Sequence, residues 1–337
     1  MKIKSSLKNW KGINNRLLSF KNNLNDNSIN FATASDYGFG QEEIKREIKN
    51  IENIEIKEKP SKDFMSYFVG FMDGDGYFDI SPQKQTNKKT KEESRTTIRL
   101  RLASNLHSRD ISLLEKFQKE LKVGTLSKMS SLNGKRDQVR IIFSRRDLIN
   151  VIIPLMKEYN LKILTYQRQT QYNLLNYILD NNLTHWDMIN KDQILATTTQ
   201  LSLNSLINTR NSLDFKYFME LPQFLNWLVG FSEAEASFGI KKDNSAFYNI
   251  RQTGIENLEL IKAIKILIKG KIGSEIKADS SNSYQISFSS KKDIQTIINF
   301  FSFSNNYPLS GYKKVQYDLW ITNLKNNKRY CLLNLPS

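Results

Sequence analysis

The chain has 337 residues, enough for two domains of ordinary size, and a formal net charge of +16 at pH 7. Its 50 Lys and Arg residues against 34 Asp and Glu indicate a polyanionic partner whose phosphates would dominate affinity. No stretch approaches about 18 uninterrupted apolar residues, which excludes a membrane-spanning helix. The single Cys331 excludes an internal disulfide and a multi-cysteine zinc site, and the only histidines, His107 and His185, are too far apart to indicate a metal pair.

Residues 1–62 are polar, with Lys, Asn, Asp and Glu mixed and few apolar runs. They lack the apolar core of about 7–15 residues that a secretory signal requires. The acids Glu42, Glu43 and Glu47 argue against a transit peptide over the whole stretch. We therefore expect a polar N-terminal extension or linker, in which residues 41–58 could form a charged helix.

A segment that follows this extension occurs twice in the chain. The copies are Tyr67-Phe-Val-Gly-Phe-Met-Asp-Gly-Asp-Gly-Tyr-Phe78 and Trp227-Leu-Val-Gly-Phe-Ser-Glu-Ala-Glu-Ala-Ser-Phe238. Each is an apolar run, expected to be helical, that ends in acid, small residue, acid. Small residues four apart share one helix face, which allows another backbone to approach closely. The predicted helix-packing residues are Gly70, Gly74, Gly230 and Ala234.

If these two helices pack on each other, Asp75 lies beside Glu235, with Asp73 and Glu233 close by. Adjacent carboxylates raise each other's pKa, and the partial negative charge at a helix C-terminus adds to the cost. A divalent cation offsets both costs, and one or two carboxylates with water and phosphate describe a Mg²⁺ site. Two such ions about 3.5–4 Å apart can clamp the attacking and leaving oxygens of a phosphodiester. A glycine-rich turn or a weak Ca²⁺ loop would explain one copy, but two copies disfavour it.

The segment after the first motif changes from helical to strand periodicity. Residues 77–80 alternate, residues 83–95 read as a basic hairpin loop, and residues 97–102 alternate again. Arg99 and Arg101 are expected to face outward, where they suit contacts with base edges and phosphates in a major groove. A charged loop is usually only solvated, but this one joins two strands expected to lie on nucleic acid. The predicted nucleic-acid contacts are Lys84, Lys88, Lys89, Lys91, Arg99, Arg101, Arg140, Lys241 and Arg251.

The remaining elements indicate an internal duplication. A helix near 109–121 and strands near 124–130 and 137–143 follow, and later segments repeat this plan in shorter form. Gly124–Lys128 returns as Gly273–Lys277, Ser144–Leu148 as Ser290–Ile294, and Leu164–Leu174 aligns without gaps on Leu309–Leu319. Each unit is then helix, two strands, helix, two strands, helix and a closing helix. We expect an extension over 1–62, a first domain over 63–180, a linker over 181–215 and a second domain over 216–337.

The segments Phe68–Gly76 and Leu228–Ala236 resemble, in register, the nine-residue signature of the LAGLIDADG homing endonucleases. The resemblance covers about residues 63–330, and two motifs in one chain are similar to the single-chain, pseudo-symmetric branch. The second motif and Gln316-Tyr-Asp-Leu-Trp320 look most like fungal mitochondrial intron-encoded enzymes, several of which double as group I intron maturases. The resemblance implies an α+β fold: two αββαββα domains packed on their motif helices, with antiparallel sheets forming a DNA-binding saddle. Ala236 replaces the last glycine of the motif, where a glycine could adopt a positive φ.

The resemblance also implies roles for individual residues. It makes Asp75 and Glu235 the ligands of two or three divalent ions, expected to be Mg²⁺, while Asp73 and Glu233 brace the helix pair. A basic residue near the scissile phosphates corresponds to Arg168 and Lys313, for which a helix-end cation without chemistry is the alternative. Arginine cannot act as a base, so charge stabilisation is the expected role of Arg168. Asn105 and Gln252 match the family's water-positioning amide, with ordinary strand-end polarity as the alternative.

These inferences predict a monomeric, Mg²⁺-dependent homing endonuclease that makes a double-strand break at a long site in double-stranded DNA. The alternative is a maturase that binds and folds its group I intron RNA without cutting DNA. The acids of both motifs favour cleavage, although both activities can coexist, and a transcriptional regulator on this scaffold would have eroded acids. The Asn-, Lys- and Ile-rich composition is typical of A/T-rich genomes such as fungal mitochondrial DNA. We therefore expect an organelle-encoded protein of the mitochondrial matrix without a membrane partner.

Overall fold

The structure is a computed structural model that describes residues 59–84, 96–129, 137–189, 214–270, 273 and 275–337. The predicted contacts Lys88, Lys89 and Lys91 lie outside the described residues, as do nearly all of the N-terminal extension and residues 190–213 of the predicted linker. None of the helices in the described part of the chain is long and apolar enough to cross a bilayer.

The first half of the chain folds into helices on one side of a four-stranded antiparallel sheet. The order of the strands is β1-β2-β4-β3. The elements are α3 (Lys62–Gly74), β1 (Gly76–Gln83), β2 (Thr97–His107), α4 (Ile111–Leu121), β3 (Thr125–Met129), β4 (Gln138–Ser144), α5 (Arg145–Asp147), α6 (Ile153–Glu158) and α7 (Tyr166–Asp180). A short 3-10 turn, η5 (Trp186–Met188), follows α7.

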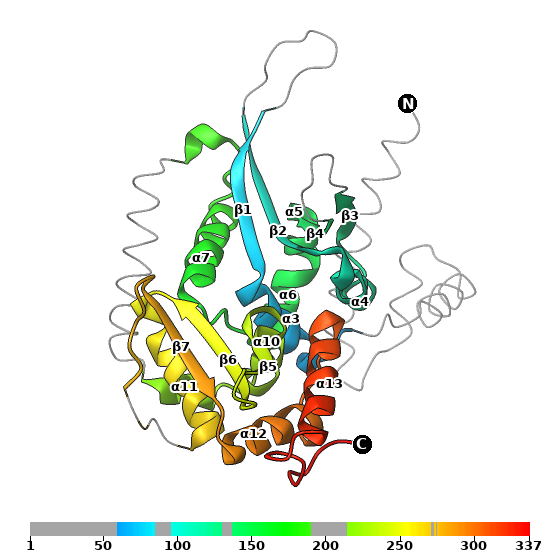
Figure 1. The fold of residues 1–337 in the computed structure, drawn as a ribbon. Coiled ribbons are helices and arrows are strands. Elements are labelled where there is room, and N and C mark those ends of the chain that lie inside the picture. The colour runs from blue at the N-terminus through cyan, green and yellow to red at the C-terminus, as the bar shows by residue number, and fades with distance from the viewer. Residues whose placement is uncertain (1–58, 85–95, 130–136, 190–213, 271–272, 274) are drawn as a thin grey trace, which may run out of the picture. The chain divides into compact units, whose positions relative to one another are not determined.

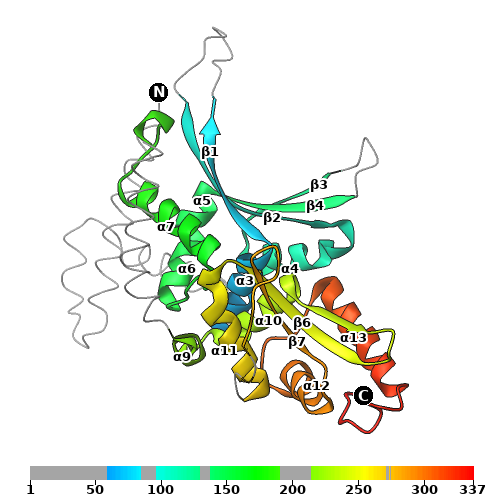
Figure 2. The same ribbon diagram turned by 60° about the vertical axis from the view of Figure 1, so that its left-hand side comes forward.

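The second half repeats this order with a smaller sheet, β5-β6-β7. Its elements are α9 (Phe215–Glu220), α10 (Phe224–Glu235), β5 (Ser237–Ile240), β6 (Ala246–Thr253), α11 (Leu258–Lys269), β7 (Ser283–Phe288), α12 (Lys291–Ile298) and α13 (Gly311–Lys325). Figure 1 shows the two sheets on either side of α3 and α10, and Figure 2 shows these two helices from another side. The predicted α+β architecture of two pseudo-symmetric units packed on their motif helices is confirmed.

The prediction of a fourth strand in the second sheet is wrong for the described residues. Residues 275–277 are not in a strand, and the segment contributes only an isolated bridge between Ala278 and Tyr284. Short-range similarity to Gly124–Lys128 therefore predicted the position of the segment but not its pairing. β7 pairs with β6 along one edge, and its other edge carries only the bridge from Tyr284 to Ala278.

Strand alternation and helix caps agree with the sequence patterns. Ile98, Leu100 and Leu102 of β2 are buried, whereas Arg99 and Arg101 are half-exposed on the opposite, outward face. Ser144 and Ser290 each accept a hydrogen bond from the backbone of the residue three positions later, as helix N-caps do. The gapless alignment of the last helices also holds, because α7 and α13 each begin two residues into the aligned segments.

Candidate active site

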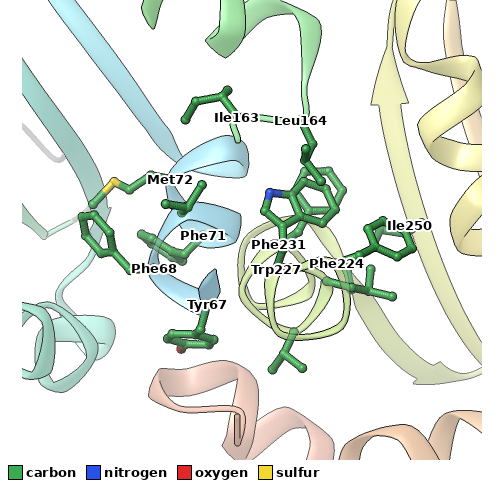
Figure 3. Packing of buried hydrophobic residues seen from close by; sticks show 14 of the residues in the cluster. Tyr67, Phe68, Phe71, Met72, Ile163, Leu164, Phe224, Trp227, Phe231 and Ile250 are labelled. Carbon is green, nitrogen blue, oxygen red and sulfur yellow. The ribbon is translucent and has the colours of Figure 1, made fainter. Parts of the chain in front are cut away.

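The motif helices α3 and α10 cross with their backbones in direct contact. A Cβ atom built on Gly70 would lie 2.0 Å from the carbonyl oxygen of Trp227, and one on Gly230 would lie 1.8 Å from that of Tyr67. Both distances are far below a van der Waals contact, so only glycine fits at either position. Figure 3 shows Tyr67 and Trp227 on neighbouring turns of the two helices, within the aromatic core that surrounds the crossing.

This crossing brings the last acids of the two motifs together. A Cβ atom on Gly74 would lie 2.4 Å from the Cβ of Ala234 and 3.0 Å from the Cγ of Glu235. Burial, followed by the charge of Glu235, raises the pKa of Asp75 to about 7. Burial also raises the pKa of Glu235. Within the described part of the chain no hydrogen bond reaches either carboxylate, so both are available to a cation.

The first acid of the first motif is buried and fully hydrogen-bonded. Oδ2 of Asp73 accepts from the backbone N of Leu164 at 2.7 Å and from Nε1 of Trp227 at 2.7 Å. Oδ1 accepts from the hydroxyl and the backbone N of Thr165, at 2.7 and 3.2 Å. Burial raises the pKa of Asp73 to about 6, against the lowering effect of these donors. This carboxylate therefore braces α3 against α10 and against the start of α7.

Glu233 has the corresponding position in the second motif. Its Oε2 accepts from the backbone N of Ser310 at 2.8 Å and from Oη of Tyr67 at 3.1 Å. Its Oε1 is buried and has no hydrogen-bond partner among the described residues. Burial raises the pKa of Glu233 to about 7, and the bond from Ser310 opposes this shift. Since Tyr67 and Trp227 hold the same place in the two motifs, each first acid is bound by the aromatic residue of the other motif.

Arg168 and Lys313 hold the same place near the start of α7 and α13, and both reach the ends of the motif helices. Nη2 of Arg168 donates to the carbonyl oxygen of Gly74 at 3.4 Å, and Nζ of Lys313 donates to that of Ala236 at 2.7 Å. Burial lowers the pKa of each cation, whereas the surrounding carboxylates raise it. Both cations in turn lower the pKa of Asp75 and Glu235. The site therefore holds two carboxylates and two cations at one junction of helix ends.

The sequence pattern of the family described as LAGLIDADG endonuclease matches residues 68–179 and 228–324, one match in each half. This chain belongs to that family. Each matched segment contains one of the two repeated motifs and the helix that carries the corresponding basic residue. Nucleases of the LAGLIDADG family generally use divalent metal ions.

Curated relatives and solved structures agree with this assignment. The chain is 28% identical over 281 residues to a probable intron-encoded endonuclease, Cox1-I1b of Schizosaccharomyces pombe, covering 80% of this chain and 67% of that protein. It is 23% identical to a probable intron-encoded endonuclease aI3 of Dictyostelium discoideum, covering 74% of this chain and 91% of that protein. The LAGLIDADG meganuclease I-CpaMI bound to uncleaved DNA shares its fold with a TM-score of 0.54, at 22% identity over 80% of this chain and 94% of that one. The LAGLIDADG homing endonuclease I-LtrWI bound to target DNA has a TM-score of 0.53 and 22% identity, covering 80% of this chain and 92% of that one.

Each LAGLIDADG half also caps the last helix of the other half, which the sequence reasoning missed. The backbone N of Tyr166 donates to Oδ1 of Asn257 at 2.9 Å, and that of Tyr312 donates to Oδ1 of Asp110 at 3.0 Å. Asp110 and Asn257 precede the equivalent helices α4 and α11. A short polar residue before both helices was the available signal. The charge of Asp110 also raises the pKa of Asp75, the last acid of the motif in the same half.

The two predicted amides lie in different surroundings. Nδ2 of Asn105 donates to Oη of Tyr77 at 3.4 Å, on the outward face of the first sheet. Gln252 lines a pocket together with Glu235, Arg251, Thr253, Ser281 and Ser283. When the two sheets are superposed through the pairs of Phe78 and Phe238, Asn105 corresponds to Arg251, the residue before Gln252. The second sheet has one residue more between this position and the helix that follows. The predicted equivalence therefore holds by distance from the helix but not by sheet register.

The predicted nucleic-acid contacts that the structure describes lie on the outward faces or tips of the two sheets. Arg140 donates to Oη of Tyr77, and Arg251 forms a 2.7 Å ion pair with Asp279. Lys241 begins the turn between β5 and β6 and is exposed, as is Lys84 next to the end of β1. The first sheet thus carries several outward-facing cations, whereas on the second sheet Arg251 is paired with Asp279 and Lys241 lies at the turn.

The motif glycine replaced by Ala236 does not need a positive φ. Ala236 has φ −84° and ψ 159°, an extended conformation that any residue adopts. Its counterpart Gly76 is constrained by space, since a Cβ atom there would lie 2.5 Å from the carbonyl oxygen of Met72. The helix α10 continues through Glu235, one residue further than α3 does, which gives Ala236 room.

The residues at the junction fit a divalent cation. Among the described residues there is no cluster of three or more His, Cys, Asp or Glu side chains that could enclose a metal. Asp75 and Glu235 instead form a pair of unbonded carboxylates; burial raises the pKa of both, and the charge of Glu235 raises that of Asp75 further. A hard cation that takes one or two carboxylates and completes its shell with water and phosphate matches this donor set.

Proposed function

We propose that this chain is a single-chain homing endonuclease that hydrolyses both strands of double-stranded DNA at one long target. The observation that carries the proposal is the pair of unbonded carboxylates, Asp75 and Glu235, at the joined ends of the motif helices. Outward-facing cations lie on the sheets at either side of this pair. The relatives are named intron-encoded endonucleases and the structural neighbours are bound to DNA, which supports the same activity.

In this proposal Asp75 and Glu235 would hold the divalent ions, expected to be two or three Mg²⁺. The bound ions would supply Lewis-acid stabilisation of the phosphoryl oxygens. Arg168 and Lys313 stabilise the negative charge that develops as water attacks each phosphate, because both cations are held at the same junction. Asn105 and Gln252 position the water. Asp73 and Glu233 brace the helices and touch neither phosphate nor metal.

The two halves would act as domains over residues 63–180 and 216–337, joined by a linker over 181–215, in a monomer. A chain with both acids needs no second copy to form the junction. The first sheet would bind one half of the target through Lys84, Arg99, Arg101 and Arg140, and the second through Lys241 and Arg251. The relatives are named intron-encoded, which supports an organelle-encoded, mitochondrial protein that spreads its intron. The maturase alternative is not favoured, because these relatives are named endonucleases.

The proposal is tested with purified protein, Mg²⁺ and a duplex that spans the junction left when the host intron is removed. Wild-type protein should cut both strands, and Asp75→Asn should bind the duplex with unchanged affinity but cut it at least about 10³-fold more slowly. Binding without cutting by the wild type, together with rescue of intron splicing by both proteins, would replace the endonuclease with a maturase.

A further inference from the structure

The first sheet extends further from the acid pair than the second sheet does. Phe78 of β1 pairs with Leu102 of β2, and the pairing continues for five more residues, to Gln83 and Thr97. β4 stays beside β2 only as far as Arg101, so the end of this ribbon projects beyond the rest of the sheet. Figure 1 shows β1 and β2 rising past β3 and β4.

The second sheet stops three residues earlier. Phe238, which holds the place of Phe78 in its motif, pairs with Tyr248, and the pairing ends two residues later at Ile240 and Ala246. A turn over residues 241–244 closes the ribbon there. At about 3.3–3.4 Å per residue, the three missing residues shorten this sheet by about 10 Å.

Residues from outside the repeated units support the long end of the first sheet. Beyond the last residue of β4, the segment 184–186 takes the free edge of β2. The backbone N of Ile98 donates to the oxygen of Thr184, and that of Trp186 donates to the oxygen of Thr96, both at 2.9 Å. These residues lie in the segment predicted to be the linker, and the structure pairs them with the end of the ribbon through an isolated antiparallel bridge between Thr97 and His185.

The corresponding edge of the second sheet is closed instead. Oη of Tyr330 accepts from the backbone N of Ala246 at 3.0 Å and donates to the oxygen of Ser289 at 3.2 Å. The donor that another strand would use is therefore already bound. Only the first sheet is lengthened and widened at its far end.

This arrangement adds His185 to the outward face. His185 lies directly opposite Thr97 in an antiparallel bridge, and opposite residues in such a pair point to the same side of the sheet. Arg99, two residues along β2, shares that side. Nδ1 of His185 and Nε of Arg99 are both buried and have no hydrogen-bond partner among the described residues. Both side chains are nevertheless half-exposed, so the exposed parts of the imidazole and the guanidinium can meet a polar ligand such as a base edge or a phosphate.

We propose that the DNA target is asymmetric, with about three more base pairs under the first sheet, and that His185 contacts the outermost of them. The base pairs of DNA are spaced by about 3.4 Å, so the extra 10 Å of strand spans about three of them. Imidazole can donate to or accept from base edges in a major groove, which gives the contact sequence preference. This inference rests on the proposed function, and it adds a specificity residue that lies outside both motifs and both repeats.

The test is a scan in which each base pair of the target duplex is replaced in turn and binding is measured in metal-free buffer. For the wild type, the sensitive positions should reach about three base pairs further from the cut on one side than on the other. His185→Ala should reduce discrimination at the outermost sensitive positions about tenfold and leave the inner positions unchanged. Thr184→Ala is the matched control, because its side chain points to the opposite side of the same short segment.

The outcomes separate this inference from the proposed function. Equal reach on both sides would overturn the asymmetry, and a His185→Ala profile identical to that of the wild type would overturn the assignment of His185. A change of equal size in Thr184→Ala would also overturn that assignment, since it would attribute the effect to the segment rather than to the imidazole. If the wild type bound and cut no duplex at all, the proposed function itself would be wrong.

Discussion

Trp227 donates a 2.7 Å hydrogen bond from Nε1 to Oδ2 of Asp73, and this bond ties the two motif helices together through a buried carboxylate. Its counterpart runs the other way, from Oη of Tyr67 to Oε2 of Glu233 at 3.1 Å. Such bonds are strong because one partner is charged and water is excluded. The helix pair is thus held by polar bonds at its centre as well as by close backbone contact.

The substitution Trp227→Phe should lower the free energy of unfolding by about 2–3 kcal/mol, because it removes a donor to a buried carboxylate and part of a large ring. Tyr67→Phe keeps its ring and removes only a hydroxyl, so about 1–2 kcal/mol is expected. Urea unfolding followed by tryptophan and far-UV signals measures both. A loss below about 0.5 kcal/mol in Trp227→Phe would show that this bond contributes no net stability.

Adding one methyl group at the helix crossing should lower the free energy of unfolding far more than removing one nearby. Gly230→Ala would place Cβ 1.8 Å from the carbonyl oxygen of Tyr67, so the helices must separate, at a cost of about 3 kcal/mol or more. Ala236→Gly is the control in the same motif, and it should cost only about 0.5–1 kcal/mol through backbone entropy. Thermal unfolding of both variants checks this. Equal melting temperatures for Gly230→Ala and the wild type would contradict the close packing.

The acid junction should make stability depend on pH in a defined direction. Burial raises the pKa of Asp75 in the folded protein to about 7, above the value of about 4 for an unfolded Asp. The folded state therefore keeps the proton of Asp75 to a higher pH than the unfolded state does. The contribution of protonated Asp75 to the free energy of unfolding is complete below about pH 4 and is lost as the pH rises through 7. In metal-free buffer, the stability of the wild type relative to Asp75→Asn should fall by on the order of 1–3 kcal/mol between pH 4.5 and about 7.5.

The comparison with Asp75→Asn removes the pH dependence that the other carboxylates contribute to the stability of both proteins. Unfolding midpoints at several pH values measure the difference, and added divalent cation should reduce it, because a bound cation favours the ionised acid. A relative stability that rises with pH in metal-free buffer would mean that Asp75 is not destabilised as an anion in the folded protein.

Replacing either of the two junction cations, Arg168 or Lys313, should slow the cleavage of one DNA strand, and the two variants should affect opposite strands. Arg168→Met and Lys313→Met each delete one positive charge from equivalent positions, and each should slow the cleavage of one strand by about 10²–10³-fold. The nicked duplex should then accumulate, with the nick on opposite strands in the two variants. Strand-specific end labels measure this directly. Equal slowing of both strands by each variant would show that the cations act on the junction as a whole.

The outward arginines should contribute to binding through phosphates. Arg101→Ala, on the outward face of β2, should reduce the slope of log affinity against log salt by about 1. The matched control is Lys325→Ala at the end of α13, which should leave that slope unchanged. Binding isotherms at salt concentrations between about 50 and 200 mM provide the measurement. An unchanged slope in Arg101→Ala would place this arginine away from DNA.

The sequence by itself was sufficient for the features that repeat at short range. The two motifs and the alternation around Arg99 and Arg101 were predictable, because each depends on residues a few positions apart. The gapless alignment of the last helices also located Arg168 and Lys313 together. Net charge indicated the class of partner, since it is a property of composition alone.

The family resemblance gave the two acids of each motif different roles, but only the tertiary structure showed the contacts that separate them and completed the site. Both motifs read acid, small residue, acid, and nothing local says that Asp73 is bound by Trp227 while Asp75 is left unbonded. The caps from Asp110 and Asn257 and the position of His185 depend on partners about 90 to 200 residues away in the chain, and the fourth strand near residue 277 is lost because that segment does not pair along β7. Periodicity tells which face of an element is buried, but the residue that it meets there is decided by how the elements pack.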